Sequence, residues 1–191
     1  RKLWQRKDLL EIMRRSIKEH RFSVWYQPIY CCHRDIFCSA EALLRLNDYN
    51  GVPISPEVFI PLAEGSGIID DLTWLVVEDA CRLLSSGQVP KLESISINLS
   101  LQQFLDPNLP ACFQKYLTAY QVDPSRIKVE ITERFLLHNA AHAQQQFAAL
   151  SAIGIELYMD DFGTGYSNLS SVLDYPFNFI KVDRSLVQHA P

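Results

Sequence analysis

The sequence predicts an α/β fold whose mainly parallel sheet curls into part of a TIM-type (β/α) barrel. Three observations predict it. Short apolar strands alternate with amphipathic helices at intervals of roughly 30 residues, the pattern of a parallel sheet with helical crossovers. Polar residues end nearly every strand, which is typical of the catalytic rim of such a barrel. No G-x-G-x-x-G or Walker motif is present, so a doubly wound nucleotide-binding sheet is less well supported.

The N-terminal segment is predicted to form one helix and a pair of strands. Residues 7–20 place apolar side chains every three or four positions, which is the period of an amphipathic helix. The run 22–29 is rich in β-branched and aromatic residues, which favour strands, and the run 37–46 is mostly apolar; we interpret both as strands. A short turn at 33–35 joins them, so we expect a hairpin.

The remaining elements alternate between helix and strand. Ser55 is a plausible N-cap for a short helix that begins at Pro56, and Gly65 and Gly67 are expected to end this helix after Glu64. The other predicted elements are a helix at 70–86, a strand at 95–98, a helix at 110–120, a strand at 127–132, a helix at 140–153, a strand at 155–159, a short helix at 169–173 and a strand at 179–182.

Length and composition indicate a folded chain with a single domain. Its 191 residues suit one core, divided into an N-terminal helix over 1–20 and a barrel portion over 22–191. Apolar residues make up 48% and charged residues 21%, which argues against disorder. A net charge of -4 gives no general attraction to nucleic acid or anionic lipid, so we expect neither partner for this segment.

Five cysteines, an odd number in a chain of this size, favour a reducing compartment, and we expect a cytoplasmic location. Cys31, Cys32, His33 and Cys38 also suggest a zinc or redox site. The paired short spacings of a structural zinc site are missing, however. We therefore prefer the simpler explanation, in which the cysteines are small apolar residues around a hairpin turn.

A group of oxygen-bearing side chains ends successive strands. Asn98, Glu130 and Asp160 are spaced 32 and 30 residues apart, about one strand-helix unit each, and Glu41 and Asp161 complete the group. If the strands are neighbours, these side chains converge, and their carboxylates repel one another unless cations neutralise them. Oxygen donors favour Mg²⁺ or Mn²⁺. Two such ions can support in-line displacement at phosphorus, which indicates phosphoester hydrolysis.

Two basic residues fit the same chemistry. Lys181 ends the last predicted strand and has a place beside the nucleophilic water or a phosphate oxygen, and Arg45 could bind a phosphate with two parallel hydrogen bonds. The alternative explanation is that each strand-end carboxylate is a helix cap or a surface salt bridge. That explanation is the commoner one for a single position, but it is weak for five positions on successive units.

Seven short motifs follow one another along the chain. They are Tyr26-Gln-Pro-Ile29, Ala40-Glu-Ala-Leu-Leu-Arg45, Ile60-Pro-Leu-Ala-Glu64, Asn98-Leu-Ser100, Glu130-Ile-Thr-Glu133, Asp160-Asp-Phe-Gly-Thr-Gly-Tyr-Ser167 and Lys181-Val-Asp183. Taken together, they resemble the motifs of the EAL domain family of cyclic di-GMP phosphodiesterases, in the family's order and near its spacings, from about residue 8 to the end.

The resemblance implies a role for each matching residue. The reaction would open cyclic di-GMP to linear pGpG with Mg²⁺ or Mn²⁺. Arg45 would contact phosphate, and Lys181 would orient the attacking water. The resemblance leaves open which residues hold the guanine bases; our own candidates are Gln27 and Tyr166. The catalytic group would comprise Lys181, Glu41, Asp160 and Asp161, with Glu41, Asn98, Glu130 and Asp160 as ligands of one ion and Asp161 as a ligand of a second.

The resemblance also implies partners. Residues 161–169 match the loop that couples dimerisation and partner signals to the metal site, so a homodimer is expected. Fused sensor or GGDEF-type domains, and any membrane anchor, would lie outside this chain. The chain would then be the output module of a bacterial signalling protein.

One departure concerns the C-terminal end. Members of the family continue for two further strand-helix units, which supply a glutamate proposed as general base and a glutamine near the substrate. Without these units the barrel cannot close, and the first and sixth strands keep open edges. We expect the two units to exist beyond Pro191; a second chain that supplies them and a damaged domain are the alternatives.

Two other functions remain open. An EAL-like receptor would bind cyclic di-GMP without hydrolysing it and signal to a protein partner. A pure interaction scaffold would bind neither ligand nor metal, but it would have no use for a group of mutually repelling carboxylates.

Overall fold

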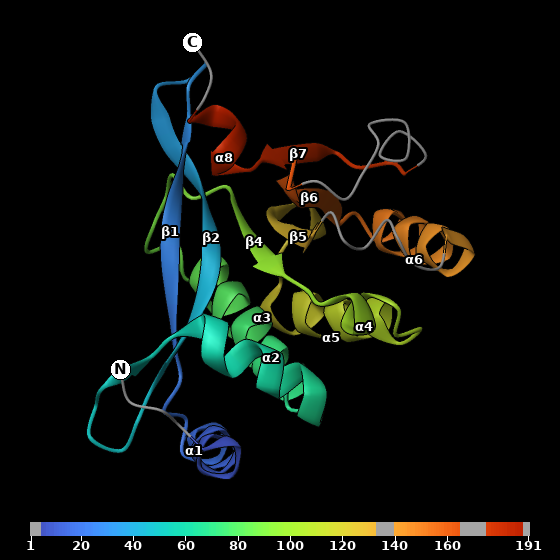
Figure 1. Ribbon diagram of the computed structural model, residues 1–191. Coiled ribbons are helices and arrows are strands. Elements are labelled where there is room, and N and C mark those ends of the chain that lie inside the picture. Colours follow the sequence, from blue (N-terminus) through green and yellow to red (C-terminus); the bar gives the residue numbers. More distant parts are fainter. Residues whose placement is uncertain (1–4, 133–139, 165–174, 189–191) are drawn as a thin grey trace.

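The fold is a curled mixed sheet with helices packed against one face, as seen in the computed structural model, which describes residues 5–132, 140–164 and 175–188 (Figure 1). The strands are β1 (Ser23–Cys31), β2 (Ile36–Asn47), β3 (Pro53–Ile54), β4 (Ser94–Asn98), β5 (Ile127–Thr132), β6 (Glu156–Phe162) and β7 (Phe179–Val182). The helices are α1 (Arg6–Lys18), α2 (Pro56–Ser66), α3 (Ile69–Ser86), α4 (Leu101–Phe104), α5 (Leu109–Tyr120), a 3₁₀ turn (Pro124–Arg126), α6 (Ala140–Ala152) and α8 (Arg184–Val187).

The strand order confirms the predicted fold class. The sheet runs β1-β2-β4-β5-β6-β7, and β3 pairs only with β2. β1 is antiparallel to β2, whereas each later step from β2 to β7 is parallel. Since parallel strands end at the same edge of a sheet, the carboxyl ends of β2, β4, β5, β6 and β7 gather at one rim. Within the described residues β1 and β7 are the two edges of this partial barrel.

The outer face of the sheet packs against helices. Every second strand residue points to this face, and together with α3, α5 and α6 these residues form one buried core. Its largest members include Phe104, Phe113 and Phe147, each 0% exposed. A second cluster joins α1 and α2 to β2 through Met13, Phe59 and their neighbours. The helices therefore hold the strands in register, and the opposite face is left to carry polar groups.

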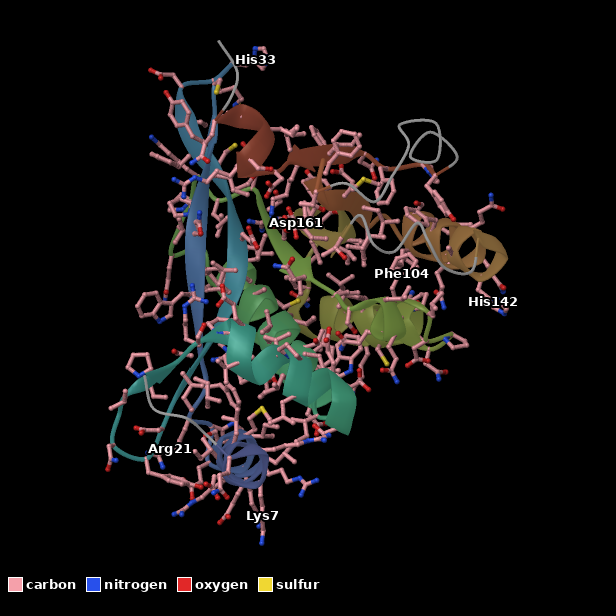
Figure 2. All side chains as sticks on the ribbon, viewed as in Figure 1. Lys7, Arg21, His33, Phe104, His142 and Asp161 are labelled. Atoms are coloured by element: carbon pink, nitrogen blue, oxygen red, sulfur yellow. The ribbon has the colours of Figure 1, made fainter. Side chains whose placement is uncertain are left out.

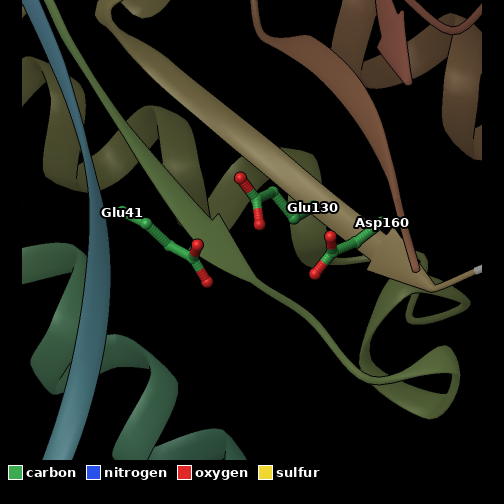
Figure 3. Close-up of side chains that lie close together, drawn as sticks. All are labelled: Glu41, Glu130 and Asp160. Carbon is green, nitrogen blue, oxygen red and sulfur yellow. The ribbon is translucent and has the colours of Figure 1, made fainter. Parts of the chain in front are cut away.

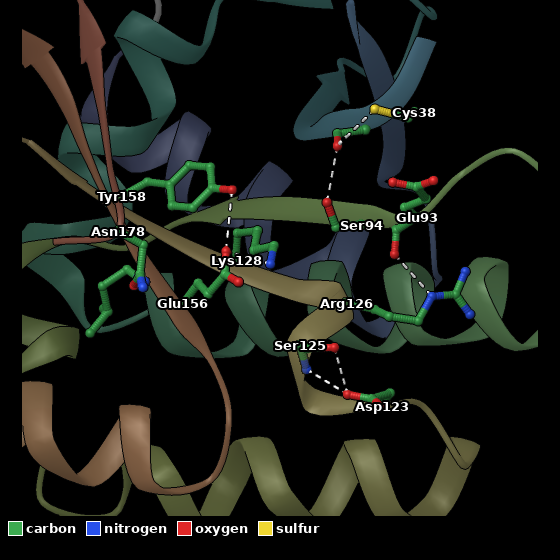
Figure 4. Close-up of polar contacts among 12 residues, drawn as sticks. Cys38, Glu93, Ser94, Asp123, Ser125, Arg126, Lys128, Glu156, Tyr158 and Asn178 are labelled. Atoms are coloured by element: carbon green, nitrogen blue, oxygen red, sulfur yellow. Dashed lines mark hydrogen bonds and ion pairs between the residues drawn. The ribbon is translucent and has the colours of Figure 1, made fainter. Parts of the chain in front are cut away.

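The opposite face, which we call the inner face, is polar along much of its length. Near the amino ends of β5 and β6, the buried Lys128 ammonium forms an ion pair with Glu156 (Nζ to Oε2, 2.6 Å), and the Tyr158 hydroxyl donates to the same carboxylate (Figure 4). Ser39 and Ser94 hydrogen bond nearby at 3.1 Å. These contacts give the polar groups on this part of the inner face a partner, so the sheet can carry charged residues here as well as at the rim.

Several predicted boundaries need correction. Gly65 lies inside α2, which ends only at Gly67, where the backbone turns left-handed (φ 73°). Ser55 occupies the N-cap position but its side chain makes no capping hydrogen bond. The sequence analysis missed β3, α4, the 3₁₀ turn and α8, all four residues or shorter. The helix predicted at 169–173 falls outside the described residues.

Candidate active site

Three carboxylates from three strands meet on the inner face near the rim. Glu41 comes from β2, Glu130 from β5 and Asp160 from β6, and one oxygen of each lies within 4.8 Å of the others (Figure 3). The parallel registers bring the strands side by side through β4 and align their carboxyl ends. The strand alternation that buries their neighbours among the helices turns all three side chains to the inner face. Residues up to 119 positions apart thus share one small volume.

Lys181 from β7 lies among these carboxylates. Its Nζ is 2.6 Å from Oε2 of Glu130, 3.0 Å from Oε2 of Glu41 and 3.3 Å from Oδ1 of Asp160. Burial of the ammonium disfavours its charged form, but the hydrogen bonds and charges of Glu130, Glu41 and Asp160 outweigh burial and raise the pKa of Lys181. The lysine therefore stays protonated and balances part of the negative charge.

Glu130 is the most enclosed of the three acids. Its side chain is 0% exposed, and burial raises the pKa of its carboxyl against the opposing effect of Lys181. One oxygen, Oε2, accepts from Lys181, whereas Oε1 is buried and has no hydrogen-bond partner among the described residues. The Ser96 Oγ on β4 is also buried and also has no hydrogen-bond partner among the described residues. A buried carboxylate oxygen without a partner is costly, so this atom has an unused capacity to bind a cation or a donor.

Asn98 joins the group at the end of β4. Its Nδ2 donates to Oε1 of Glu41 at 2.7 Å. The group therefore offers carboxylate oxygens with a side-chain amide beside them, and no Cys or His belongs to any candidate metal group among the described residues. Such a donor set suits hard divalent cations rather than zinc.

The second acid of the Asp160-Asp161 pair lies apart. Asp161 is exposed and its backbone adopts a left-handed conformation (φ 58°), and its carboxyl is not among the three that converge. Partial burial, and then the charges of Asp160 and Asp183, raise its pKa. The geometry thus gathers three of the four predicted acidic ligands, with the predicted amide Asn98 attached to one of them.

A pocket of about 860 Å³ adjoins the carboxylates. It lies between the carboxyl ends of β2 and β4 and the helices α2 and α3, and its lining is mostly aliphatic. The polar residues that line it include Arg45, Glu57, Glu64, Thr73, Asn98 and Asp161. Asn98 both lines the pocket and donates to Glu41, so the pocket borders the carboxylate group at this residue.

Other predicted residues are placed as follows. Gln27 is exposed on β1, where it pairs directly with Glu41 across the antiparallel ladder. Of the predicted coupling loop 161–169, only 161–164 are described, so Tyr166 and the dimer contact lie outside the described residues. The cysteines are all free, and His33 lies at the tip of the β1–β2 hairpin, well apart from Asp161 (Figure 2).

The sequence analysis missed two features of the site. It gave Lys181 a water or a phosphate as its partner, but in the structure the ammonium pairs with all three carboxylates. It also overlooked Trp25, whose ring lies beneath the Arg45 guanidinium. The sequence carried no signal for the second feature, because the contact depends on the register of β1 against β2.

Comparisons with known proteins agree with this architecture. Residues 10–191 match the sequence model of the EAL domain. Signaling protein YkoW of Bacillus subtilis (strain 168) is 33% identical over 177 residues, which cover 92% of this chain. Probable cyclic di-GMP phosphodiesterase PdeB of Escherichia coli (strain K12) is 34% identical over 174 residues, which cover 90% of this chain.

A solved structure shares the fold. The structure described as PaMucR phosphodiesterase, c-di-GMP complex, superposes with a TM-score of 0.86 at 30% identity, covering 95% of this chain and 76% of that chain. The match spans only 22% of YkoW and 33% of PdeB. No helix within the described residues is long and apolar enough to cross a membrane.

Proposed function

Because the chain belongs to the EAL domain family, we propose that it hydrolyses cyclic di-GMP at the group formed by Glu41, Glu130, Asp160 and Lys181. The observation that carries this function is the convergence of three carboxylates and one lysine at the strand rim, next to a pocket of nucleotide size. The name of PdeB and the cyclic di-GMP bound to the PaMucR phosphodiesterase support the choice of substrate. Water would cleave one phosphodiester P–O bond and leave linear pGpG.

The residues present fit a divalent cation. Their donors are oxygens, and the buried Oε1 of Glu130 lacks a partner among the described residues. Glu41, Glu130, Asp160 and Asn98 would hold Mg²⁺ or Mn²⁺, and Asp161 would contribute to a second ion. When bound, such an ion supplies Lewis-acid stabilisation of negative charge on a phosphate oxygen.

The basic residues would position the substrate. Lys181 keeps its proton at Nζ, so it acts as a hydrogen-bond donor that orients a water or a phosphate oxygen rather than as a base. Arg45 lines the pocket and would contact a phosphate with its guanidinium. The aliphatic lining of the pocket offers room for a base, with Gln27 on the neighbouring edge strand as a further contact.

The activity would belong to a larger protein. YkoW and PdeB are at least about three times as long as the matched part. We place the chain as a cytoplasmic output module of such a signalling protein, with homodimerisation through the 161–169 region as its partner interaction.

A second candidate function is that of a receptor that binds cyclic di-GMP without turnover. One observation favours it: the Lys181 ammonium already neutralises part of the carboxylate charge, so the group has a partner without any metal ion. In that state the pocket and Arg45 would still bind the nucleotide.

Hydrolysis with matched variants separates these functions. The full chain is incubated with cyclic di-GMP and either Mg²⁺ or Mn²⁺, and the products are resolved by chromatography. We expect linear pGpG from the unaltered chain and none from Glu41→Gln, whereas Glu11→Gln, on the exposed face of α1, acts as the unaltered chain does. Binding without product in both metals selects the receptor. The absence of both binding and product contradicts both functions.

A further inference from the structure

Trp25 is an exposed aromatic residue on the same face of the sheet as the carboxylates. The antiparallel register of β1 with β2 pairs Trp25 with Leu43 and Gln27 with Glu41. Directly paired residues point to the same face of a sheet, and so do residues two apart. Trp25 therefore lies on the inner face beside the site, where its side chain is 63% exposed. A large exposed aromatic side chain next to a polar site is a candidate for a functional role.

Its contact is Arg45. The guanidinium carbon lies 5.4 Å from the centroid of the Trp25 ring, across the diagonal of the β1–β2 ladder. Nη1 also donates to the carbonyl oxygen of Leu44 at 3.0 Å. None of the ion pairs among the described residues involves Arg45, although Glu41 and Asp160 lie at the same rim. The charge of this guanidinium is thus held by a ring face and a carbonyl, and it remains available to an anion.

A ring face holds a guanidinium differently from a carboxylate. A guanidinium held over an aromatic ring uses none of its N–H groups in that contact. N–H groups that stay free in this way can bind a phosphate with two parallel hydrogen bonds. The contact with the ring also limits the rotamers of a long, flexible side chain, so less entropy is lost when an anion binds.

Given the proposed function, on which this step rests, we propose that Trp25 is a positioning residue that holds the Arg45 guanidinium ready for a phosphate of the cyclic dinucleotide. Trp25 acts through Arg45 and takes no part in bond cleavage. Its loss weakens substrate binding and spares the chemical step, because the contact with the phosphate is the same before and during the reaction.

The test is a double-mutant cycle on the full chain with cyclic di-GMP and Mn²⁺. Trp25→Ala raises KM about two- to fivefold, the size of an exposed cation–π contact, and changes kcat less. Trp25→Phe retains a ring face and recovers most of the loss, whereas Trp25→Leu does not. In the Arg45→Ala background, Trp25→Ala adds nothing further, since the group that it positions is gone.

Tyr49 provides the matched control. It is also exposed and lies under two guanidinium groups, Arg15 at 5.2 Å and Arg21 at 6.0 Å, away from the site. Tyr49→Ala leaves KM and kcat unchanged.

Equal KM for Trp25→Ala and the unaltered chain overturns the role of Trp25, as does a loss that persists undiminished in the Arg45→Ala background. If the unaltered chain neither binds nor cleaves cyclic di-GMP, the proposed function itself fails. If Trp25→Ala does not fold, the comparison of Trp25→Phe with Trp25→Leu decides.

Discussion

The ammonium of Lys181 lies 2.6 Å from the carboxylate of Glu130, whose side chain is 0% exposed. The two residues stand 51 positions apart, on β5 and β7, with β6 between them. This ion pair offsets part of the cost of burying the Glu130 carboxylate at the rim, and it links the strand at one edge of the sheet to the site. The Lys181–Glu130 ion pair at the rim therefore contributes to the stability of the fold.

Removal of the Lys181 ammonium should lower the stability of the fold. Lys181→Met leaves the Glu130 carboxylate buried without its cation, and we expect a loss of about 3 kcal/mol in the free energy of unfolding, measured with urea. Adding Glu130→Gln to Lys181→Met should recover much of the loss, because the unpaired charge is removed. Lys91→Met, at an exposed position, should change stability by less than about 0.5 kcal/mol. Equal effects at Lys181 and Lys91 would show that the pair carries no such energy.

Gln103 makes a buried hydrogen-bond network next to the pocket. It completes a capping box with Ser100, and its Nε2 donates to Asp70 at 3.0 Å and to Thr73 at 2.9 Å. Gln103→Ala removes the partner of the buried Thr73 hydroxyl, whereas the exposed Asp70 stays in contact with solvent. The substitution should destabilise the fold by about 1–3 kcal/mol. Its exposed neighbour provides the control, since Gln102→Ala should be nearly neutral in the same thermal denaturation experiment. Two variants with equal midpoints would refute this.

Gly163 follows the Asp160-Asp161 pair in a conformation that favours glycine. Its φ is 102°, and an added Cβ would lie 2.0 Å from the Leu186 side chain. We expect Gly163→Ala to destabilise the fold by about 1–2 kcal/mol through backbone strain, even if Leu186 moves aside.

Gly65 is the opposite case. It lies inside α2 with no atom within 4 Å of the added Cβ, so Gly65→Ala should stabilise the fold by about 0.4–1 kcal/mol. Chemical denaturation of both variants checks the pair. A stabilising Gly163→Ala would contradict the described backbone at this position.

The buried thiol of Cys81 should make the free energy of unfolding depend on pH. Burial in α3 raises the pKa of its thiol from 9.0 to about 11. The unfolded chain ionises this thiol at the lower pH, so the stability that the neutral thiol contributes is complete below pH 9 and is lost as pH rises toward 11. The free energy of unfolding of Cys81→Ala should therefore fall less steeply over this range than that of the unaltered chain. Parallel curves from pH 8 upward would rule this out.

The sequence predicted most elements because their apolar periods are clear. The strand at 127–132 was predicted with its observed bounds, since Ile127, Val129 and Ile131 alternate cleanly. α4 was missed because four residues cannot show a helical period. Its capping box, Ser100 with Gln103, was the signal that could have revealed it. The end of α2 was predicted too early at Gly65, because a glycine in a helical pattern often marks the end of a helix.

The site was predictable in part for a related reason. Strand ends mark a common rim, so the meeting of Glu41, Glu130 and Asp160 could be anticipated from their spacing. The presence of Lys181 at this rim was also anticipated, but its ion pairs with all three carboxylates were not, because spacing along the chain does not give side-chain contacts. The Trp25–Arg45 contact depends on an antiparallel register that contains a shift between Ile29 and Tyr30, and no spacing rule gives this register.

Mn²⁺ binding in the absence of nucleotide tests most directly whether the three carboxylates form a metal site. Free aqueous Mn²⁺ is followed by electron paramagnetic resonance during titration of the full chain. We predict that Glu41→Gln and Asp160→Asn each weaken binding roughly tenfold or more, while Glu11→Gln binds as the unaltered chain does. If all four chains bind Mn²⁺ equally, or if the unaltered chain does not bind it, the carboxylate group is not a metal site.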